Sequence, residues 1–324
     1  SYFQLLNFTS LLILVFILNM IFYTDRHKER IYLFLSFIGF LTSVFAIIIY
    51  LNGNPNFLFF KNSYYQKSST GFFVNRTVFS IFLLFCIIAS LEFLKNLDQI
   101  KYDKKKDNFF IKIYIRIFII FITIGIITSF SRIGNFLLFI TVLSYLINEF
   151  YYSKEKNKSF LNIILLIIVF DIIILGLYFG SSELIDRFLF LKEELALVNS
   201  TDLNLNRFQI AKFGLTQFYD FKFFGYGAGS FETLFQINFI DLNNFYANHA
   251  HSDLVEFIGE FGLIGFTFLF ISLLGFILNI DNYSFLNFIL AIYLVVLLFF
   301  DFSLHIPIVQ FLFIVFFNLN KKKT

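Results

Sequence analysis

Long apolar runs recur from one end of this chain to the other and are separated mostly by short polar connections. A helix needs about 20 predominantly apolar residues to cross a bilayer, and several runs reach that length. The pattern predicts an all-α polytopic membrane protein, a bundle of about nine transmembrane helices. The predicted segments are residues 5–23, 31–51, 74–94, 111–130, 133–152, 160–180, 254–278, 285–300 and 306–319.

The composition supports this class and excludes others. Hydrophobic residues make up 58% of the 324 residues and charged residues 15%, whereas a soluble domain carries roughly a quarter charged residues. The net charge of +3 is small and its lysines cluster in short loops, so we expect no nucleic acid partner. A single cysteine, Cys86, excludes an internal disulfide and a cysteine metal site. The chain begins with Ser1 close to an apolar run, and we expect a missing N-terminal part.

Lysine and arginine in the connections predict the topology, because cytoplasmic loops carry an excess of both. Four basic clusters, within residues 26–30, 95–112, 154–158 and 321–323, fall on one side, which we assign to the cytoplasm. Residues 52–73 and 181–253 then form loops on the opposite face, the periplasm in a bacterium. We expect one integral membrane domain, residues 1–324, with residues 181–253 as a large helical loop within it. Apolar stripes over residues 184–195 and 208–218 predict two or more amphipathic helices there.

Three arginines fall on the predicted periplasmic side. Arg132 lies in the tight turn between two apolar segments, where a guanidinium near hydrocarbon is costly. Arginine binds phosphate in a bidentate way that lysine cannot copy. Arg76 opens the third segment and Arg207 lies in the long loop. The alternatives are an interfacial arginine that reaches lipid headgroups, for Arg132 and Arg76, and an ordinary solvated residue, for Arg207.

Gly225, Gly227 and Gly229 follow Arg207 in the long loop. Their spacing is that of a turn that cradles phosphate, but no strand is predicted before them, which excludes a dinucleotide fold. Glycine permits positive φ and close backbone approach, so the minimum interpretation is a tight loop.

His251 and Ser252 stand where the long loop meets the seventh segment, at a helix predicted to start near Asp253 or Leu254, with Ser252 or Asp253 as its N-cap. The helix start and nearby arginines should lower the pKa of His251 and keep it neutral as a base. Glu256, in the first turns of this helix, would orient the histidine or favour the helix dipole.

A capping or interfacial histidine is the alternative for His251. A metal site of His249, His251 and Asp253 would need a further rigid ligand that is not evident, so we predict no metal. Asp301 and His305 lie between the last two segments, either as part of the site or as a simple turn pair. Pro307 marks the next helix start.

Together these motifs resemble the O-antigen ligase and O-antigen polymerase superfamily of bacterial inner-membrane glycosyltransferases. The likeness runs from about residue 70 to 310. It rests on the motifs Gly71-Phe72-Phe73-Val74-Asn75-Arg76, Ser131-Arg132-Ile133-Gly134, Phe223-Phe224-Gly225-Tyr226-Gly227-Ala228-Gly229-Ser230-Phe231, His251-Ser252 with Gly262-Leu263-Ile264-Gly265, and Asp301 to Pro307. Thr77 and Phe224 depart from the pattern, which usually has asparagine and proline there.

The resemblance implies a GT-C-like fold and transfer of a glycan from undecaprenyl diphosphate to an acceptor hydroxyl on the lipid A core or another glycan. It implies no metal, cofactor or nucleotide, and membrane lipids as surroundings. We assign His251 as the base and Arg132, Arg207 and Arg76 to the diphosphate. Supporting residues are Ser252, Glu256, Gly225, Gly227, Gly229, Asp301 and His305. The site would face the periplasm from the inner membrane.

Other functions stay open. A polymerase of the same superfamily would use a second lipid-linked repeat as acceptor, and a third family activity attaches glycans to protein. A transporter or flippase for lipid-linked sugars would also need arginines, although transporters tend to place polar groups near the membrane midplane. We favour the ligase because its histidine motif matches fully.

Overall fold

The computed structural model describes residues 2–20, 25–55, 67–99, 105–152, 207–239, 247–278 and 284–319, with scattered positions between 160 and 169. Over these residues the chain forms helices joined by turns and loops. Its contacts divide it into two compact units, one of Ser1–Ile21 with Ser182–Thr324 and one of Phe22–Ser181. Each unit has its own packing. The domain boundaries expected from the sequence stay a prediction.

Within the described residues five helices are long and apolar enough to cross a membrane, and shorter apolar helices accompany them. The long ones are Arg26–Leu51, Arg76–Leu97, Phe109–Thr128, Arg132–Tyr151 and Asp253–Ser272, and the shorter ones are Tyr2–Leu18, Phe285–Phe300 and Pro307–Leu319. These helices coincide with eight of the predicted segments. The remaining one, predicted at 160–180, lies largely outside the described residues. The predicted helical, multi-pass membrane protein is confirmed.

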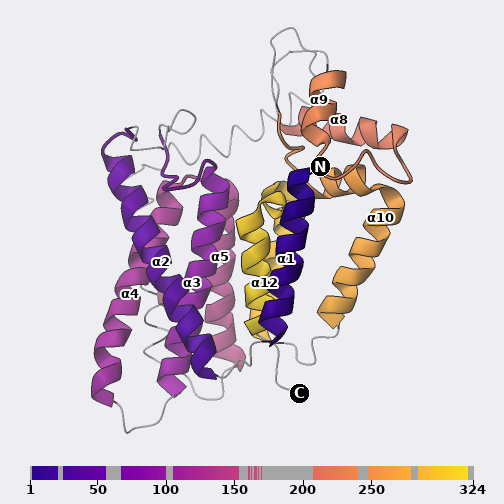
Figure 1. Cartoon of the computed structure of the whole chain (residues 1–324). Coiled ribbons are helices and arrows are strands. Elements are labelled where there is room, and N and C mark those ends of the chain that lie inside the picture. Colours follow the sequence, from indigo (N-terminus) through magenta and orange to yellow (C-terminus); the bar gives the residue numbers. More distant parts are fainter. Residues whose placement is uncertain are drawn as a thin grey trace. The chain divides into compact units, whose positions relative to one another are not determined.

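The unit Phe22–Ser181 is built around one buried helix, α3 (Arg76–Gln99). Its most apolar stretch of 18 residues is 94% buried inside the protein. The covering helices run alongside it and are α2 (Asp25–Leu51), α4 (Lys105–Thr128) and α5 (Arg132–Ile147), which continues into the short π-helix η2 (Asn148–Tyr152) (Figure 1).

Small residues allow these helices to approach closely, as is common in membrane bundles. Gly39 of α2 faces Cys86 of α3, where an added Cβ would lie 2.4 Å from the Cys86 Cβ. Gly134 of α5 faces Ser80 of α3 in the same way, at 2.5 Å from its Cβ. The glycine of the Ser131 to Gly134 motif therefore serves packing against α3.

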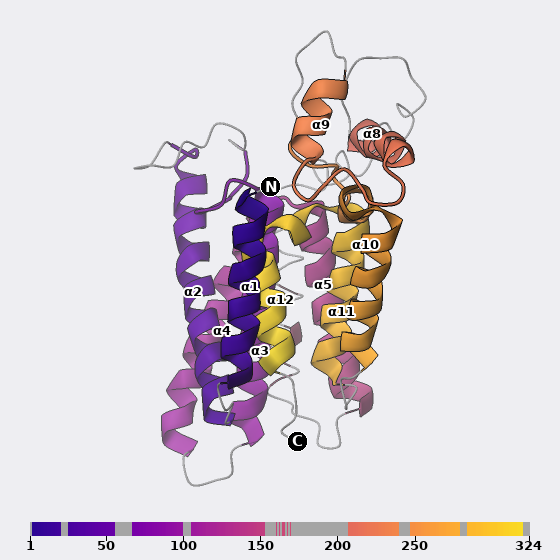
Figure 2. The same cartoon turned by 45° about the vertical axis from the view of Figure 1, so that its right-hand side comes forward.

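The other unit joins the first helix to the C-terminal part of the chain. Here α1 (Tyr2–Met20) lies beside α12 (Pro307–Leu319), and Asn7 donates a hydrogen bond to Gln310 (2.9 Å). Helix α10 (Asp253–Leu278) packs on α11 (Phe285–Phe300), which the 3-10 turn η5 (Ser303–His305) links to α12 (Figure 2).

Two helices of the expected large loop lie at the end of α10 where that helix begins (Figures 1 and 2). They are α8 (Arg207–Asp220), which packs on α10, and α9 (Phe231–Asn238). A helix over the stripe predicted at 208–218 is confirmed, but its buried residues are Ile210 and Gly214, whereas Phe208 and Leu215 of that stripe are exposed. The stripe expected over 184–195 lies outside the described residues. The starts predicted at Asp253 and Pro307 are confirmed as well.

Helix α10 is sharply bent at Gly262, whose φ of 63° and ψ of −178° are not helical. A bend leaves backbone groups without their intrahelical partners. The loop between α8 and α9 supplies partners for two of these groups. The N–H groups of Leu263 and Ile264 donate to the carbonyls of Lys222 (2.8 Å) and Phe223 (3.2 Å). The hydropathy pattern runs through this point without a break, so the bend was not predicted.

Gly262 is required at this bend for two reasons. Positive φ is unfavourable for residues with a Cβ, and a Cβ here would lie 2.4 Å from the carbonyl oxygen of Phe223. We expect Gly262→Ala to destabilise the protein by about 1–3 kcal/mol or more. Thermal loss of helical circular dichroism in detergent measures this. Gly275→Ala is the matched control, because a Cβ there meets open space. Equal melting temperatures for the two variants would contradict the role of the bend.

Candidate active site

The loop that leads into α10 holds His251 in a strained backbone conformation. Its φ is +57°, in the left-handed region that residues with a Cβ rarely occupy. The flanking backbone is fixed on both sides: the N–H of Ala250 donates to Glu256 (2.9 Å), and the N–H of Asp253 donates to the carbonyl of Asp301 (2.7 Å). Such strain persists where surrounding contacts over-determine a conformation, and it concentrates at functional sites.

The His251 imidazole is neutral at neutral pH. Burial lowers its pKa most, the positive charge of Arg207 and the neighbouring His249 lower it further, and Glu256 opposes them, which leaves a pKa of about 4. The direction agrees with the expectation, although burial and not the arginine is the main cause. The ring of Phe302 packs against it edge to face, with 5.3 Å between ring centroids. Among the described residues the buried Nδ1 has no hydrogen-bond partner. This nitrogen is the kind of unsatisfied group that a bound molecule completes.

Arg207 belongs to the same neighbourhood as His251. It is the first residue of α8, exposed, and its charge acts on both His251 and Asp301. Helix α8 is held there by close packing of Gly214 against Val255 of α10. An exposed guanidinium beside a neutral imidazole can bind an anionic group next to a base.

Glu256 holds a different histidine from the one expected. Its Oε1 lies 2.9 Å from Nδ1 of His249, and its Oε2 accepts from the N–H of Ala250. His249 also stacks on Phe302, with 4.6 Å between centroids. The hydrogen bonds of Glu256 to described residues thus go to His249 and Ala250, and its role in orienting His251 stays a prediction. Glu256 acts on His251 through the loop and through its charge.

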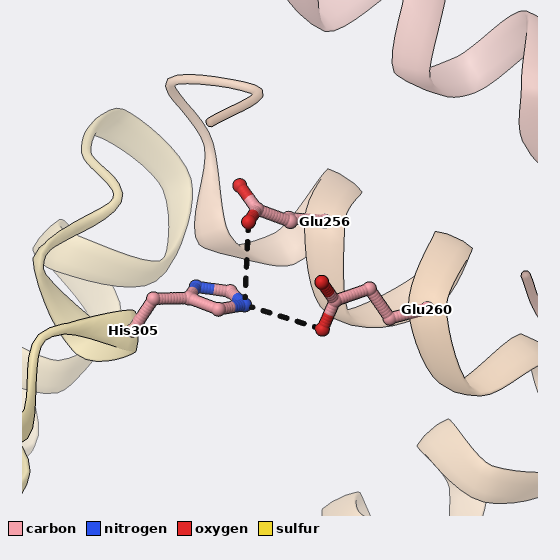
Figure 3. Close-up of side chains that lie close together, drawn as sticks. All are labelled: Glu256, Glu260 and His305. Atoms are coloured by element: carbon pink, nitrogen blue, oxygen red, sulfur yellow. Dashed lines mark ion pairs between the residues drawn. The ribbon is translucent and has the colours of Figure 1, made fainter. Parts of the chain in front are cut away.

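His305 pairs with α10 and not with Asp301. Its Nδ1 is hydrogen-bonded to Asp253, whose other oxygen accepts from the N–H of Leu304 (2.7 Å). Its Nε2 lies 3.6 Å from one oxygen each of Glu256 and Glu260 (Figure 3). Burial by itself lowers the pKa of His305, but the bond to Asp253, the interaction with Glu260 and the charge of Glu256 outweigh it and raise the pKa to about 10.

Asp301 caps the end of α11, and its carboxylate accepts a hydrogen bond from Ser303. The carboxylate of Asp301 therefore pairs with Ser303 and not with His305, as a turn pair would require. Burial raises the pKa of Asp301, against the Ser303 hydrogen bond and the charge of Arg207. The backbone carbonyl of Asp301 accepts a hydrogen bond from the N–H of Asp253. Asp301 thus fixes the start of α10 from the neighbouring helix end.

The glycine-rich turn forms a tight loop that packs on α10. Gly225, Gly227 and Gly229 all have positive φ. The N–H groups of Gly225 and Gly227 donate to the carbonyls of Phe221 (2.9 Å) and Glu260 (3.0 Å), and that of Gly229 donates to the Glu260 carboxylate (2.7 Å). These N–H groups already have partners within the protein, so the interpretation as a phosphate cradle is replaced by the tight loop.

Arg76 and Arg132 belong to the other compact unit, where each is the first residue of a helix. Asn75 caps α3, its Oδ1 accepting from the N–H of Thr77 (2.7 Å), and Ser131 caps α5, its Oγ accepting from the N–H of Gly134 (3.1 Å). Ser252 is buried, and its carbonyl accepts from the N–H of Glu256 (3.1 Å). The roles proposed for the two arginines stay predictions.

Sequence reasoning missed Phe302, which contacts both His249 and His251, and the carboxylate set around His305. A signal for the latter was present. Asp253, Glu256 and Glu260 are spaced by three and four residues, which places them on one face of a helix that otherwise runs into an apolar segment. The metal site considered from the sequence consisted of His249, His251 and Asp253, whereas the described residues that could share an ion are Glu256, Glu260 and His305.

Comparison with known families bears on the same region. Residues 117–270 match the family model of the O-antigen ligases. The match confirms the resemblance and supports membership of the O-antigen ligase superfamily. No curated protein and no solved structure matches the chain.

The O-antigen ligase match supports a glycosyltransferase of the ligase or polymerase type, and substrates of the lipid-linked glycan class. It spans Arg132, Arg207, the glycine-rich turn, His251 and the bend at Gly262. Arg76, Asp301 and His305 lie outside it, so their assignment rests on the sequence motifs and, for the last two, on the contacts described above.

The neutrality of His251 can be measured directly. We expect ¹³C-histidine NMR of the detergent-solubilised protein to show one imidazole that titrates near pH 4, and this resonance should vanish in His251→Gln. Arg207→Gln should raise the midpoint, because a nearby cation is removed, yet leave it below 6.5, because burial remains. A wild-type midpoint at the ordinary value of about 6.5 would contradict the described environment.

Proposed function

We propose that this protein transfers a glycan from undecaprenyl diphosphate to a sugar hydroxyl, with His251 as general base and Arg207 on the diphosphate. The observation that carries the proposal is a neutral, partly buried imidazole, whose Nδ1 has no hydrogen-bond partner among the described residues, in the field of an exposed arginine. The base and the anion-binding group are both needed for attack on a sugar that carries a diphosphate leaving group.

The reaction follows from these two groups. The acceptor O–H gives its proton to His251 as its oxygen bonds to the anomeric carbon. The bond from that carbon to the diphosphate oxygen breaks, and the electron pair leaves with undecaprenyl diphosphate. Attack from the face opposite the leaving group inverts the anomeric centre. Proton removal by a positioned base contributes roughly 10²–10⁴-fold, and fixed cations stabilise the developing charge on the diphosphate.

The supporting residues hold His251 and the start of α10 in position. Asp301 and Glu256 fix the backbone on either side of His251, and the glycine-rich turn holds the bend of α10. Arg132 and Arg76 are assigned to the diphosphate from the sequence. We place the reaction at the periplasmic face of the bacterial inner membrane, as the distribution of basic loops predicts.

The acceptor decides between ligase and polymerase. We favour the lipid A core, in line with the family description of the match, and a second lipid-linked repeat is the alternative. The two differ in product: a ligase joins one glycan to lipid A core, whereas a polymerase extends lipid-linked chains. A transporter would release no glycan from the lipid donor, so incubation with a radiolabelled donor separates it from both.

Removal of the base should abolish turnover and leave donor binding intact. We expect His251→Ala in purified protein to lose about 10²–10⁴-fold in the rate of transfer from radiolabelled donor, with unchanged affinity for the donor. His27→Ala, which alters a histidine on α2, serves as control. Undiminished transfer by His251→Ala would remove His251 from the mechanism.

Loss of the planar guanidinium should weaken donor binding. Hydrogen bonds to charged groups contribute about 1.5–3 kcal/mol, so Arg207→Lys is expected to bind the donor about 10–100-fold more weakly. Lys212→Gln, an exposed cation on the same helix, should bind the donor as the wild type does. If Arg207→Lys and the wild type bind undecaprenyl diphosphate equally in a vesicle assay, the arginine has another role.

A further inference from the structure

Three buried side chains converge between the start of α10 and η5. Glu256, Glu260 and His305 are 2%, 3% and 7% exposed, and one oxygen or nitrogen from each lies within 4.8 Å of the other two. Figure 3 shows that the His305 ring points its Nε2 toward both carboxylates. Among the described residues this nitrogen has no hydrogen-bond partner, and it is aimed into the group.

Each of the three side chains is held from behind by another group. Asp253 binds Nδ1 of His305, the N–H of Ala250 donates to Glu256 Oε2, and the N–H of Gly229 donates to Glu260 Oε1. The atoms that face one another are His305 Nε2, Glu256 Oε1 and Glu260 Oε2, and Glu256 Oε1 also lies 2.9 Å from Nδ1 of His249. Metal-binding histidines almost always give their other ring N–H to a carboxylate or carbonyl, and ligating carboxylates are themselves hydrogen-bonded.

The distances from His305 Nε2 to the two carboxylate oxygens suit a cation bound between them better than direct hydrogen bonds. His305 Nε2 lies 3.6 Å from each carboxylate oxygen, too far for a hydrogen bond. Ligands that bind zinc at about 2.1 Å in tetrahedral geometry lie about 3.4 Å apart. A small cation placed among the three atoms, which lie within 4.8 Å of one another, would contact all of them once the side chains close around it.

The charge also favours a cation. Three carboxylates, those of Asp253, Glu256 and Glu260, share this buried region with His305. Buried charges are costly unless they are paired or coordinate a metal. A protonated His305 offsets one of the three negative charges, and Nδ1 of His249 lies 2.9 Å from the Oε1 atom of Glu256.

We propose that Glu256, Glu260 and His305 bind one divalent transition-metal cation, Zn²⁺ or Mn²⁺, with water in the remaining positions. Two carboxylate oxygens and one imidazole nitrogen suit these ions, whereas Mg²⁺ and Ca²⁺ prefer oxygen alone. On binding, His305 releases its Nε2 proton to solvent and ligates through the freed electron pair. The ion fastens the first turns of α10 to η5. Glu256 also fixes the loop that carries His251, so metal content and melting temperature, which do not depend on transfer, are the readouts.

The metal content of the intact protein tests the site. We expect protein purified in detergent, loaded separately with Zn²⁺ or Mn²⁺ and passed through gel filtration, to retain about one ion per chain by mass spectrometry, as a single site requires. EDTA should lower the melting temperature, and Zn²⁺ or Mn²⁺ should restore it while Mg²⁺ does not. Protein that retains neither ion and melts equally with and without EDTA overturns the proposal, and the cluster is then a proton-bridged ion pair only.

Variants separate ligands from their supports. Glu260→Gln keeps an acceptor for the N–H of Gly229 but loses the charge, and should weaken metal binding at least about tenfold. Asp253→Asn should weaken it about 10–100-fold through the orientation of His305. Glu232→Gln on α9, outside the cluster, is the matched control and should bind as the wild type does. If Glu260→Gln folds by gel filtration and binds metal as tightly as Glu232→Gln, the assignment of ligands is wrong.

Discussion

One face of the first turns of α10 carries Asp253, Glu256 and Glu260, and the arrangement of the candidate site depends on how these carboxylates are paired. Asp253 holds His305, Glu256 holds His249 and the backbone of Ala250, and Glu260 holds the glycine-rich turn through Gly229. Each contact joins α10 to a different part of the chain. The polar start of an otherwise apolar helix is thereby buried in protein, where unpaired charge would be costly.

The bend at Gly262 makes this arrangement compatible with a membrane helix. It lets the polar turns of α10 depart from the direction of the apolar stretch that follows, while the loop at Lys222 and Phe223 accepts the freed N–H groups. With α10 fixed in this way, His251 is held in a left-handed conformation between anchored neighbours. The imidazole is then buried enough to stay neutral, and Arg207 on α8 lies close enough to influence its pKa.

Features that depend on local sequence were predictable, and those that depend on distant contacts were not. The starts of α10 at Asp253 and of α12 at Pro307 follow from capping and proline signals, and the apolar runs give the helices of the bundle. The pairing of His305 with Asp253 joins residues 52 positions apart, which no periodicity reveals. The bend at Gly262 is hidden because hydropathy is continuous through it. The glycine spacing indicated a tight loop without showing that its N–H groups are used internally.

The central claim is that His251 and Arg207 serve one diphosphate-bearing substrate. The most direct measurement is electron cryo-microscopy of the protein in lipid nanodiscs with an undecaprenyl diphosphate-linked glycan bound. The account predicts density for the diphosphate in contact with the Arg207 guanidinium and the anomeric carbon of the first sugar facing a ring nitrogen of His251. A diphosphate bound away from both residues, with His251 packed against protein alone, would contradict it.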